Sequence, residues 1–447
     1  MRLLKNDCII TSPHASRRSL SSLQSLQLNW CNLAGYRNAR NVAALAPALR
    51  HLPSLEHLHL SHNDLGFKGV QPLCLSLPHM TALKELNLYS NDMGDMGAAE
   101  LSAVLGGMPC LTSLNLSLND IGVDGIRALG PALCTLKSLR KLSLGSSDLG
   151  AGASLAMRPV LEALTGLEAL DISSCSLGDH GLEVLAPALA NLTRLECLEL
   201  SHNRISKINP LRLCLGRMSA LETLRLGHNP IGGLPCLAEI LEPLTSLKRL
   251  SLASVNLNPV GAKSLGRSLR HSTGLTSLDL SSNNLAGPTG SYIMDAVEGL
   301  SQLTALDLTR TELKDSCGAL SAFLSRVRGL QRLGLGGNDL GPGEMASLVP
   351  ALGQLTALER LGLGGNIIGD EGVTFLATEL QRMTKLERID LSEIGIGQRG
   401  ALTLVPALLS SMRLTLEIHK EDKVWAFLST VLRQQRHLIR GTPPFDV

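Results

Sequence analysis

Residues Leu83-Lys84-Glu85-Leu86-Asn87-Leu88-Tyr89-Ser90-Asn91 contain the pattern that decides the fold, L-x-x-L-x-L-x-x-N. Copies of this pattern begin at Leu23, Leu55, Leu83, Leu111, Leu139, Leu167, Leu195, Leu221, Leu247, Leu275, Leu303, Leu330, Leu358 and Leu386. The thirteen intervals from the first to the last start average (386 − 23)/13, or about 28 residues. A pattern that recurs at one period predicts stacked structural repeats, and it overrides the usual division of a 447-residue chain into separate globular domains.

Each repeat changes its periodicity halfway along. In the first half, apolar residues such as Leu114 and Leu116 alternate with polar ones, which is typical of a strand with one buried face. In the second half, Leu101, Leu105 and Met108 fall at i, i+4 and i+7, which places one apolar stripe on a helix. The unit is therefore predicted to be strand, turn and helix.

Two residue types recur where the strand ends. Asparagine occupies the ninth position of eight repeats, where its amide can bond backbone groups that the sheet leaves unpaired: Asn63, Asn91, Asn119, Asn203, Asn229, Asn283, Asn338 and Asn366. Cys31 and Cys175 replace it in two others, and we expect both to be structural thiols. Glycine follows the last apolar residue before the helix in nine repeats, where we expect positive φ: Gly66, Gly94, Gly122, Gly150, Gly178, Gly232, Gly341, Gly369 and Gly397.

Stacking such units must bend the chain, because strands lie about 4.8 Å apart whereas helices need about 10 Å. The predicted fold is an α/β solenoid shaped as a horseshoe, with parallel strands on the concave face and helices on the convex face. We expect an N-terminal segment or cap over 1–22, about fourteen repeats over 23–419, and a C-terminal capping helix and tail over 420–447. Two intervals between Leu195 and Leu247 shrink to 26 residues, which leaves too little chain for full helices and predicts a change of curvature.

The repeat resembles the ribonuclease-inhibitor-like class of leucine-rich repeat, and Leu358–Lys385 is a near-consensus copy. The resemblance covers roughly residues 20–420. The same class includes ribonuclease inhibitors, Ran GTPase-activating proteins and the sensor regions of NOD-like immune receptors. This chain departs from each: it is neither acidic nor rich in cysteine, its tail is basic, and it has no G-x-x-x-x-G-K-[ST] phosphate-binding loop.

Composition excludes several functions. The net charge is +2 and only ten residues are aromatic (2 Trp, 3 Tyr, 5 Phe), which argues against nucleic-acid binding. No long apolar run predicts a membrane span. Ten cysteines without a C-x-x-C pair indicate a reducing compartment, so we expect a cytoplasmic protein. A mitochondrial location is the alternative, because residues 8–55 contain no acid and the first 22 are rich in Arg and Ser.

The first candidate binding surface lies near the N-terminus of the predicted concave face. It gathers large groups in a chain with few aromatic residues, as interface hot spots do. Its members are Trp30, His57, His59, His62, Tyr89 and Leu118. A zinc site at the three histidines lacks a fourth ligand and a recognised spacing, so the sequence predicts solvated histidines and no metal.

The second candidate surface is a column of Arg332, Arg360 and Arg388 on three successive strands. Three guanidinium groups at strand spacing can clamp a carboxylate or phosphate. The alternation with Glu359, Glu387 and Asp390 favours instead a column neutralised by its own neighbours. Glycines leave the adjoining surface bare: Gly334, Gly336, Gly337, Gly362, Gly364 and Gly365.

A third stretch of the same face is acidic, with Asp171, Glu199, Asp279 and Asp307, although Arg225 interrupts it. A basic partner can dock there. No catalytic constellation and no cofactor-binding motif is identified, because any two polar residues 28 apart become neighbours in such a stack.

These observations predict a non-enzymatic scaffold that binds a protein on its concave face, in signalling or immune-type regulation, as a monomer or a subunit of a hetero-complex. The alternative, implied by the resemblance to Ran activators, is a GTPase-activating regulator of a small GTPase. A stimulated single-turnover GTP hydrolysis assay separates the two. A detached sensor region of a larger receptor and a subunit of an organelle assembly remain further alternatives.

Overall fold

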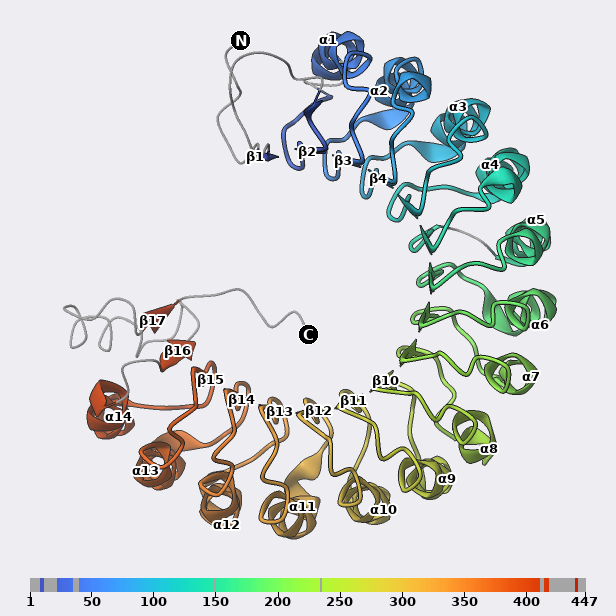
Figure 1. Cartoon of the computed structure of the whole chain (residues 1–447). Helices are drawn as coiled ribbons and strands as arrows, with labels where there is room; N and C mark the ends of the chain where they lie inside the picture. The colour runs from blue at the N-terminus through green and yellow to red at the C-terminus, as the bar shows by residue number, and fades with distance from the viewer. Residues whose placement is uncertain are drawn as a thin grey trace. The chain divides into compact units, whose positions relative to one another are not determined.

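Three-residue strands alternate with helices along the chain in the computed structural model (Figure 1). The structure describes residues 9–11, 22–34, 40–147, 150–233, 235–410, 414–417 and 439–440. Two compact units are distinguished, Met1–Asn229 and Pro230–Val447, here called unit 1 and unit 2. In each unit the parallel strands form one layer and the helices the other, so the predicted α/β repeat architecture is confirmed.

Unit 1 contains a sheet in which β2 to β9 are parallel and each is one repeat from the next. The strands are β1 (Ile9–Thr11), β2 (Ser25–Gln27), β3 (His57–His59), β4 (Glu85–Asn87), β5 (Ser113–Asn115), β6 (Lys141–Ser143), β7 (Ala169–Asp171), β8 (Cys197–Glu199) and β9 (Thr223–Arg225). The helices are α1 (Arg40–Leu49), α2 (Gly66–Cys74), α3 (Gly94–Leu105), α4 (Val123–Thr135), α5 (Gly150–Ala163), α6 (Gly178–Leu189) and α7 (Leu211–Leu215), with a 3₁₀ turn η2 (Leu77–His79). Strand β1 pairs antiparallel with β2.

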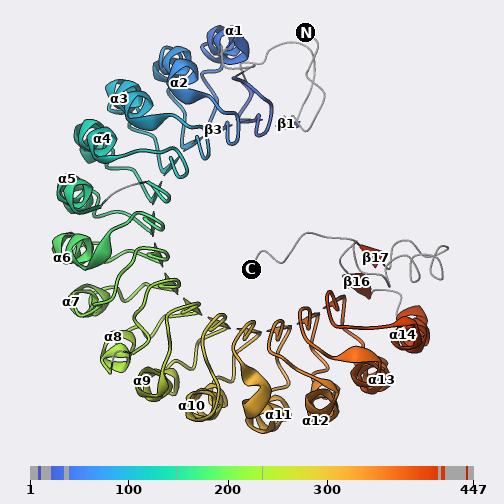
Figure 2. The same cartoon turned by 180° about the vertical axis from the view of Figure 1, so that it is seen from behind.

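Unit 2 repeats the arrangement, as the view from behind in Figure 2 also shows. Its strands are β10 (Arg249–Ser251), β11 (Ser277–Asp279), β12 (Ala305–Asp307), β13 (Arg332–Gly334), β14 (Arg360–Gly362), β15 (Arg388–Asp390), β16 (Thr415–Glu417) and β17 (Ile439–Arg440), all parallel to their neighbours. Its helices are α8 (Leu237–Leu241), α9 (Pro259–Leu269), α10 (Pro288–Val297), α11 (Cys317–Leu324), α12 (Pro342–Leu352), α13 (Gly369–Leu380) and α14 (Gln398–Ser410), with a 3₁₀ turn η3 (Leu313–Ser316).

All fourteen predicted strands occur where the pattern puts them, at the third to fifth residue of each repeat. The central residue of each strand is apolar and buried, as Leu58, Leu86 and Leu114 illustrate. The first and third residues point to the opposite side, because successive side chains of a strand alternate. We call this side, formed by the first and third residues of each strand, the strand face. A fifteenth repeat strand, β16, was not predicted, because the sequence has Arg413 where the pattern requires leucine.

The predicted asparagine ladder is confirmed and holds successive repeats together. The Nδ2 group of Asn91 donates to the carbonyl oxygens of Leu88 and Tyr89 in its own repeat and of Leu60 in the preceding one. Its Oδ1 atom accepts the N–H of Asn63, the previous member of the ladder, at 3.1 Å. Buried Cys175 uses its thiol in the same way, with Sγ 3.3 Å from the Leu144 oxygen, so it is structural as predicted.

The left-handed backbone falls at a different position from the one expected. Positive φ is found at four of the turn glycines, Gly66, Gly94, Gly178 and Gly369. The expectation is wrong for Gly122 and Gly341, whose φ values are −95° and −99°, and for Gly232 and Gly397, which are not among the glycines with positive φ. The constant left-handed corner is the eighth residue of the repeat: Trp30, His62, Ser90, Leu118, Ser146, Ser174, His202, His228, Ser254, Ser282, Arg310, Gly337, Gly365 and Glu393. At this corner the N–H of Trp30 donates to the Ser61 oxygen, which ties the turn to the next repeat.

The two shortened repeats have helices of five residues each, α7 and α8, as their length predicts. The boundary between the two units, after Asn229, falls between these helices. The change of curvature expected there stays a prediction. Residues 1–8 and 12–21 of the expected N-terminal cap lie outside the described residues, as does the expected C-terminal capping helix within 420–447. Within the described part, no helix combines the length and apolarity needed to cross a membrane.

Candidate functional site

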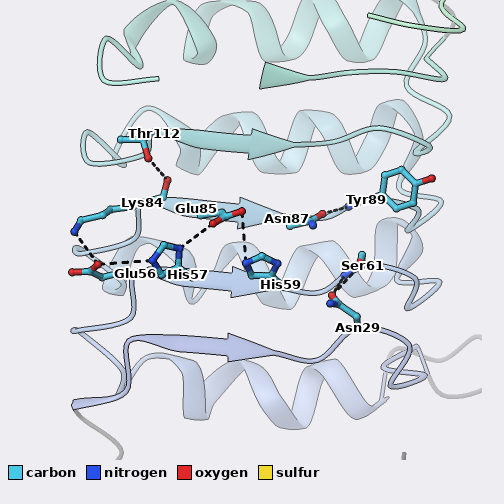
Figure 3. A network of polar contacts seen from close by, with 10 residues as sticks. All are labelled: Asn29, Glu56, His57, His59, Ser61, Lys84, Glu85, Asn87, Tyr89 and Thr112. Carbon is cyan, nitrogen blue, oxygen red and sulfur yellow. Dashed lines mark hydrogen bonds and ion pairs between the residues drawn. The ribbon is translucent and has the colours of Figure 1, made fainter. Parts of the chain in front are cut away.

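The largest polar cluster of the first candidate surface lies on β3 and β4 of unit 1 (Figure 3). His57 and His59 are two residues apart on β3, so both project from the strand face. Glu85 on β4 is the register partner of His57. One carboxylate oxygen of Glu85 lies 2.9 Å from His57 Nδ1, and the other lies 3.7 Å from His59 Nε2. The carboxylate thus lies between the two imidazoles.

A second carboxylate, that of Glu56, lies near the other ring nitrogen of His57. Glu56 Oε2 lies 4.0 Å from His57 Nε2, and the same oxygen accepts a hydrogen bond from Lys84 Nζ at 2.8 Å. The hydrogen bond from Lys84 lowers the pKa of Glu56, against the opposing effect of its burial. Glu56 is therefore held as a carboxylate, and Lys84 directs its charge toward Glu56 and away from Glu85.

Rings from three repeats meet beside this cluster. Trp30 and His62 stack with ring centroids 3.7 Å apart and planes 11° from parallel. Tyr89 meets His62 edge-on, with ring centroids 5.0 Å apart and planes at 69°. Trp30 remains 69% exposed, which is a large apolar surface to leave in water. We call Trp30, His62 and Tyr89 the ring ladder.

The ring ladder does not lie on the strands, where the sequence analysis expected it. Trp30 and His62 occupy left-handed corners, and Tyr89 directly precedes one, just beyond the strand ends. Leu118 is also a corner residue, 43% exposed, but Ser90 separates it from His62 along the corner positions. The six predicted residues therefore divide into the histidine pair on β3, the ring ladder, and Leu118 one repeat further.

The second candidate surface is formed in unit 2. Arg332, Arg360 and Arg388 are in register on β13, β14 and β15, and all three side chains are exposed. The favoured expectation, a column neutralised by Glu359, Glu387 and Asp390, is wrong. None of the three guanidinium groups forms an ion pair with an acid among the described residues. Glu359 and Glu387 each directly precede an arginine of the column and point to the opposite side, because neighbours along a strand alternate. Asp390 shares the strand face with Arg388 but accepts the N–H of Ser392 instead.

The glycines beside this column also lack a hydrogen-bond acceptor that other repeats have at the same position. In most other repeats, the fifth residue is an acid or amide that accepts the N–H two residues later, as Asp307 accepts from Thr309 at 2.8 Å and Asp390 from Ser392 at 2.9 Å. Gly334 and Gly362 have no such acceptor. Three unpaired guanidinium groups beside this bare surface suit a carboxylate-bearing ligand.

Several carboxylates of the acidic stretch accept hydrogen bonds from residues of their own repeat. In unit 1, Asp171 accepts hydrogen bonds from both the N–H and the hydroxyl of Ser173. Glu199 forms an ion pair with Arg225, in which Oε2 lies 3.4 Å from Nη1. In unit 2, burial raises the pKa of Asp307, and its register neighbour Asp279 adds to the effect. Binding of a basic partner by these carboxylates stays a prediction.

The structure adds Glu85, Glu56 and Lys84 to the candidate site residues, and none of the three was identified from the sequence. A signal was present, because Glu85 follows His57 by 28 residues, one repeat length. That spacing alone does not single out Glu85 as a partner of His57, since every residue of the repeats has a neighbour one repeat length away. The structure adds that both histidines face the same carboxylate.

Comparisons with known proteins agree with the repeat architecture. A family model described as Leucine Rich repeat matches residues 51–74, 79–102, 107–130, 164–186, 271–294 and 354–377. No curated protein matches the sequence of the chain.

Several solved structures are similar in fold. An internalin (inlF) from Listeria monocytogenes is 21% identical over 79% of this chain and 94% of its own, with a TM-score of 0.48. A TLR13 chain from a complex with ssRNA13 is 19% identical, over 83% of this chain and 55% of its own, with a TM-score of 0.45. Mouse RP105, from its complex with MD-1, is 14% identical over 88% of each chain, with a TM-score of 0.42.

Proposed function

Because the chain is a leucine-rich repeat protein, we propose that it is a non-enzymatic scaffold that binds a protein partner on the strand face and strand-end corners of unit 1. Leucine-rich repeat proteins are generally scaffolds for protein interaction. The observation that carries the proposal is the ring ladder, in which an exposed Trp30 is held rigidly by stacking on His62. Large, preordered side chains of this kind lose little entropy when a partner covers them.

Burial supports the choice of this surface. The backbone beneath the ring ladder is tied to the next repeat, because the N–H groups of Trp30 and His62 donate to the oxygens of Ser61 and Tyr89. Leu58 and Leu86, the central residues of β3 and β4, are fully buried and anchor the two strands that lead to these corners. A partner would therefore meet a surface that is already in its bound shape. Signalling or immune-type regulation is the role we propose for such binding.

We predict that replacing Trp30, His62 and Tyr89 with alanine weakens partner binding by at least about 2 kcal/mol, as loss of an interface hot spot does. The free energy of unfolding should change by less than about 0.5 kcal/mol for each substitution, because these rings lie outside the core. The partner is first captured by affinity purification with the full chain as bait, and its dissociation constant is then measured for each variant.

The matched control is the double variant His202→Ala and His228→Ala. These two corner residues also stack, at 3.8 Å and 11°, but lie elsewhere in unit 1. Their removal should leave the affinity unchanged. Equal loss in both variants would show that stacked corner residues matter for structure and not as a specific contact.

A separate prediction concerns the arginine column of unit 2. If a partner carboxylate binds there, replacing Arg332, Arg360 and Arg388 with alanine should lower the affinity and also flatten its dependence on salt, because exposed charge contacts are screened. The ring-ladder variant should keep the salt dependence. Both are measured at two salt concentrations. If neither variant changes the affinity, the proposal is wrong and the partner binds to the helices or loops.

The described residues offer no observation that favours the GTPase-regulator alternative. It stays a prediction, and stimulation of single-turnover GTP hydrolysis by the chain is the result that would support it.

A further inference from the structure

We propose that His57, His59 and Glu85 of unit 1 bind a divalent transition-metal ion of the zinc type. Each of the three residues offers one ligand atom, and these atoms lie within 4.8 Å of one another. Two imidazoles and one carboxylate form a set of ligands that zinc binds in proteins. Among the described residues, this is the only group of three or more histidine, cysteine or acidic side chains that converges in this way.

The distances are close to those that coordination requires. Zinc–ligand distances of about 2.0–2.1 Å in a tetrahedron place neighbouring ligand atoms roughly 3.3 Å apart. His57 Nδ1 and Glu85 Oε2 are 2.9 Å apart, and His59 Nε2 and Glu85 Oε1 are 3.7 Å apart. All three ligand atoms lie within 4.8 Å of one another, so the side chains must draw closer together to coordinate one ion.

The strands hold these side chains in place. His57 is paired with Glu85 across the sheet, and buried Leu58 and Leu86 anchor the two strands from below. The three ligands remain accessible, with exposed side-chain fractions of 41% for His57, 20% for His59 and 34% for Glu85. Ligands on rigid strands lose little conformational freedom on binding, which favours affinity.

A second layer of contacts suits the same chemistry. Histidine that ligates a metal through one ring nitrogen commonly directs the other toward a carboxylate. If His57 ligates through Nδ1, its Nε2 faces Glu56 at 4.0 Å, and Lys84 fixes that carboxylate by a 2.8 Å hydrogen bond. The hydrogen bond between His57 and Glu85 does not by itself account for the approach of His59 to the same carboxylate.

The site has three protein ligands and faces solvent. In a four-coordinate ion, water completes the coordination, and this is the arrangement that zinc adopts where a position is left open. The absence of a fourth protein ligand, which led the sequence analysis to predict no metal, is therefore no obstacle. This inference does not depend on the proposed partner, because the ion can be tested with the chain alone.

The experiment titrates the full chain, without a histidine tag and after chelator treatment, with Zn²⁺ alone in a calorimeter. Co²⁺ is added in parallel, because its visible absorption reports four-coordinate geometry. We expect one ion per chain with micromolar affinity or tighter. His57→Ala with His59→Ala should weaken binding by at least about 100-fold, and Glu56→Gln by about 10-fold through the outer contact.

Two further variants keep the test decisive. Glu85→Gln preserves shape but offers a poor ligand, so it should weaken binding by about 10–100-fold even if the double histidine variant fails to fold. The control is His202→Ala with His228→Ala, which removes a different histidine pair and should leave the affinity unchanged. Absence of stoichiometric Zn²⁺ binding to the unaltered chain, or equal binding by the Glu85→Gln variant, overturns the proposal.

Discussion

Replacing Asn91 with alanine should lower the free energy of unfolding by about 3–5 kcal/mol, a large effect for one small polar residue. The amide of Asn91 is fully buried and makes hydrogen bonds to two repeats. Its removal leaves the buried N–H of Asn63 without a partner. The carbonyl oxygens of Leu60 and Leu88 each lose one of two donors and keep the Nδ2 groups of Asn63 and Asn119, and each hydrogen bond lost in this way costs about 0.5–1.5 kcal/mol more. Each buried group left unpaired costs about 1–3 kcal/mol.

The matched control is Asn87→Ala in the same repeat. Asn87 accepts a single hydrogen bond, from the Tyr89 N–H at 3.0 Å, and lies half-buried on the strand face. The Asn87→Ala substitution should lower the free energy of unfolding by less than about 1 kcal/mol. Urea denaturation followed by circular dichroism compares the two variants. Similar losses for both would show that the ladder does not hold the repeats together.

Replacing Gly261 with alanine should destabilise unit 2 by about 3–5 kcal/mol or prevent it from folding. Gly261 lies in the first turn of α9, where its N–H donates to the capping side chain of Asn258 at 3.0 Å. A Cβ atom at Gly261 would overlap the backbone carbonyl of Gly232. Backbone cannot rotate out of the way as a side chain does, so α9 or the segment at Gly232 must shift.

The control is Gly318→Ala, which should raise the free energy of unfolding instead of lowering it. Gly318 lies in helix α11 of unit 2, and a Cβ atom there would meet nothing within 4 Å. Alanine favours the helix by up to about 1 kcal/mol over glycine. Thermal unfolding and hydrogen exchange over 232–270 measure both variants. A Gly261→Ala chain as stable as the unaltered one would contradict the close contact.

The sequence by itself determined the repeat, the positions of its strands and the asparagine ladder. The fourteen strands were placed correctly from the leucine positions. A shift of the strand register by one residue would turn the buried leucines to the exposed face, so only one register is compatible with the pattern. The asparagine ladder was also predictable, since a polar residue at a fixed place where strands end must pair with backbone. The short helices α7 and α8 followed from the two shortened intervals alone.

Contacts between repeats decided the rest. Trp30, His62 and Leu118 adopt left-handed backbone although their side chains do not favour it, because hydrogen bonds to the next repeat impose the corner. That Arg332, Arg360 and Arg388 form no ion pair with an acid among the described residues was not predictable, since pairing depends on where each carboxylate lies. The meeting of His57, His59 and Glu85 likewise required the register of β3 and β4. Periodicity names the neighbours of a residue, but only the packed structure determines which of those neighbours its side-chain atoms reach.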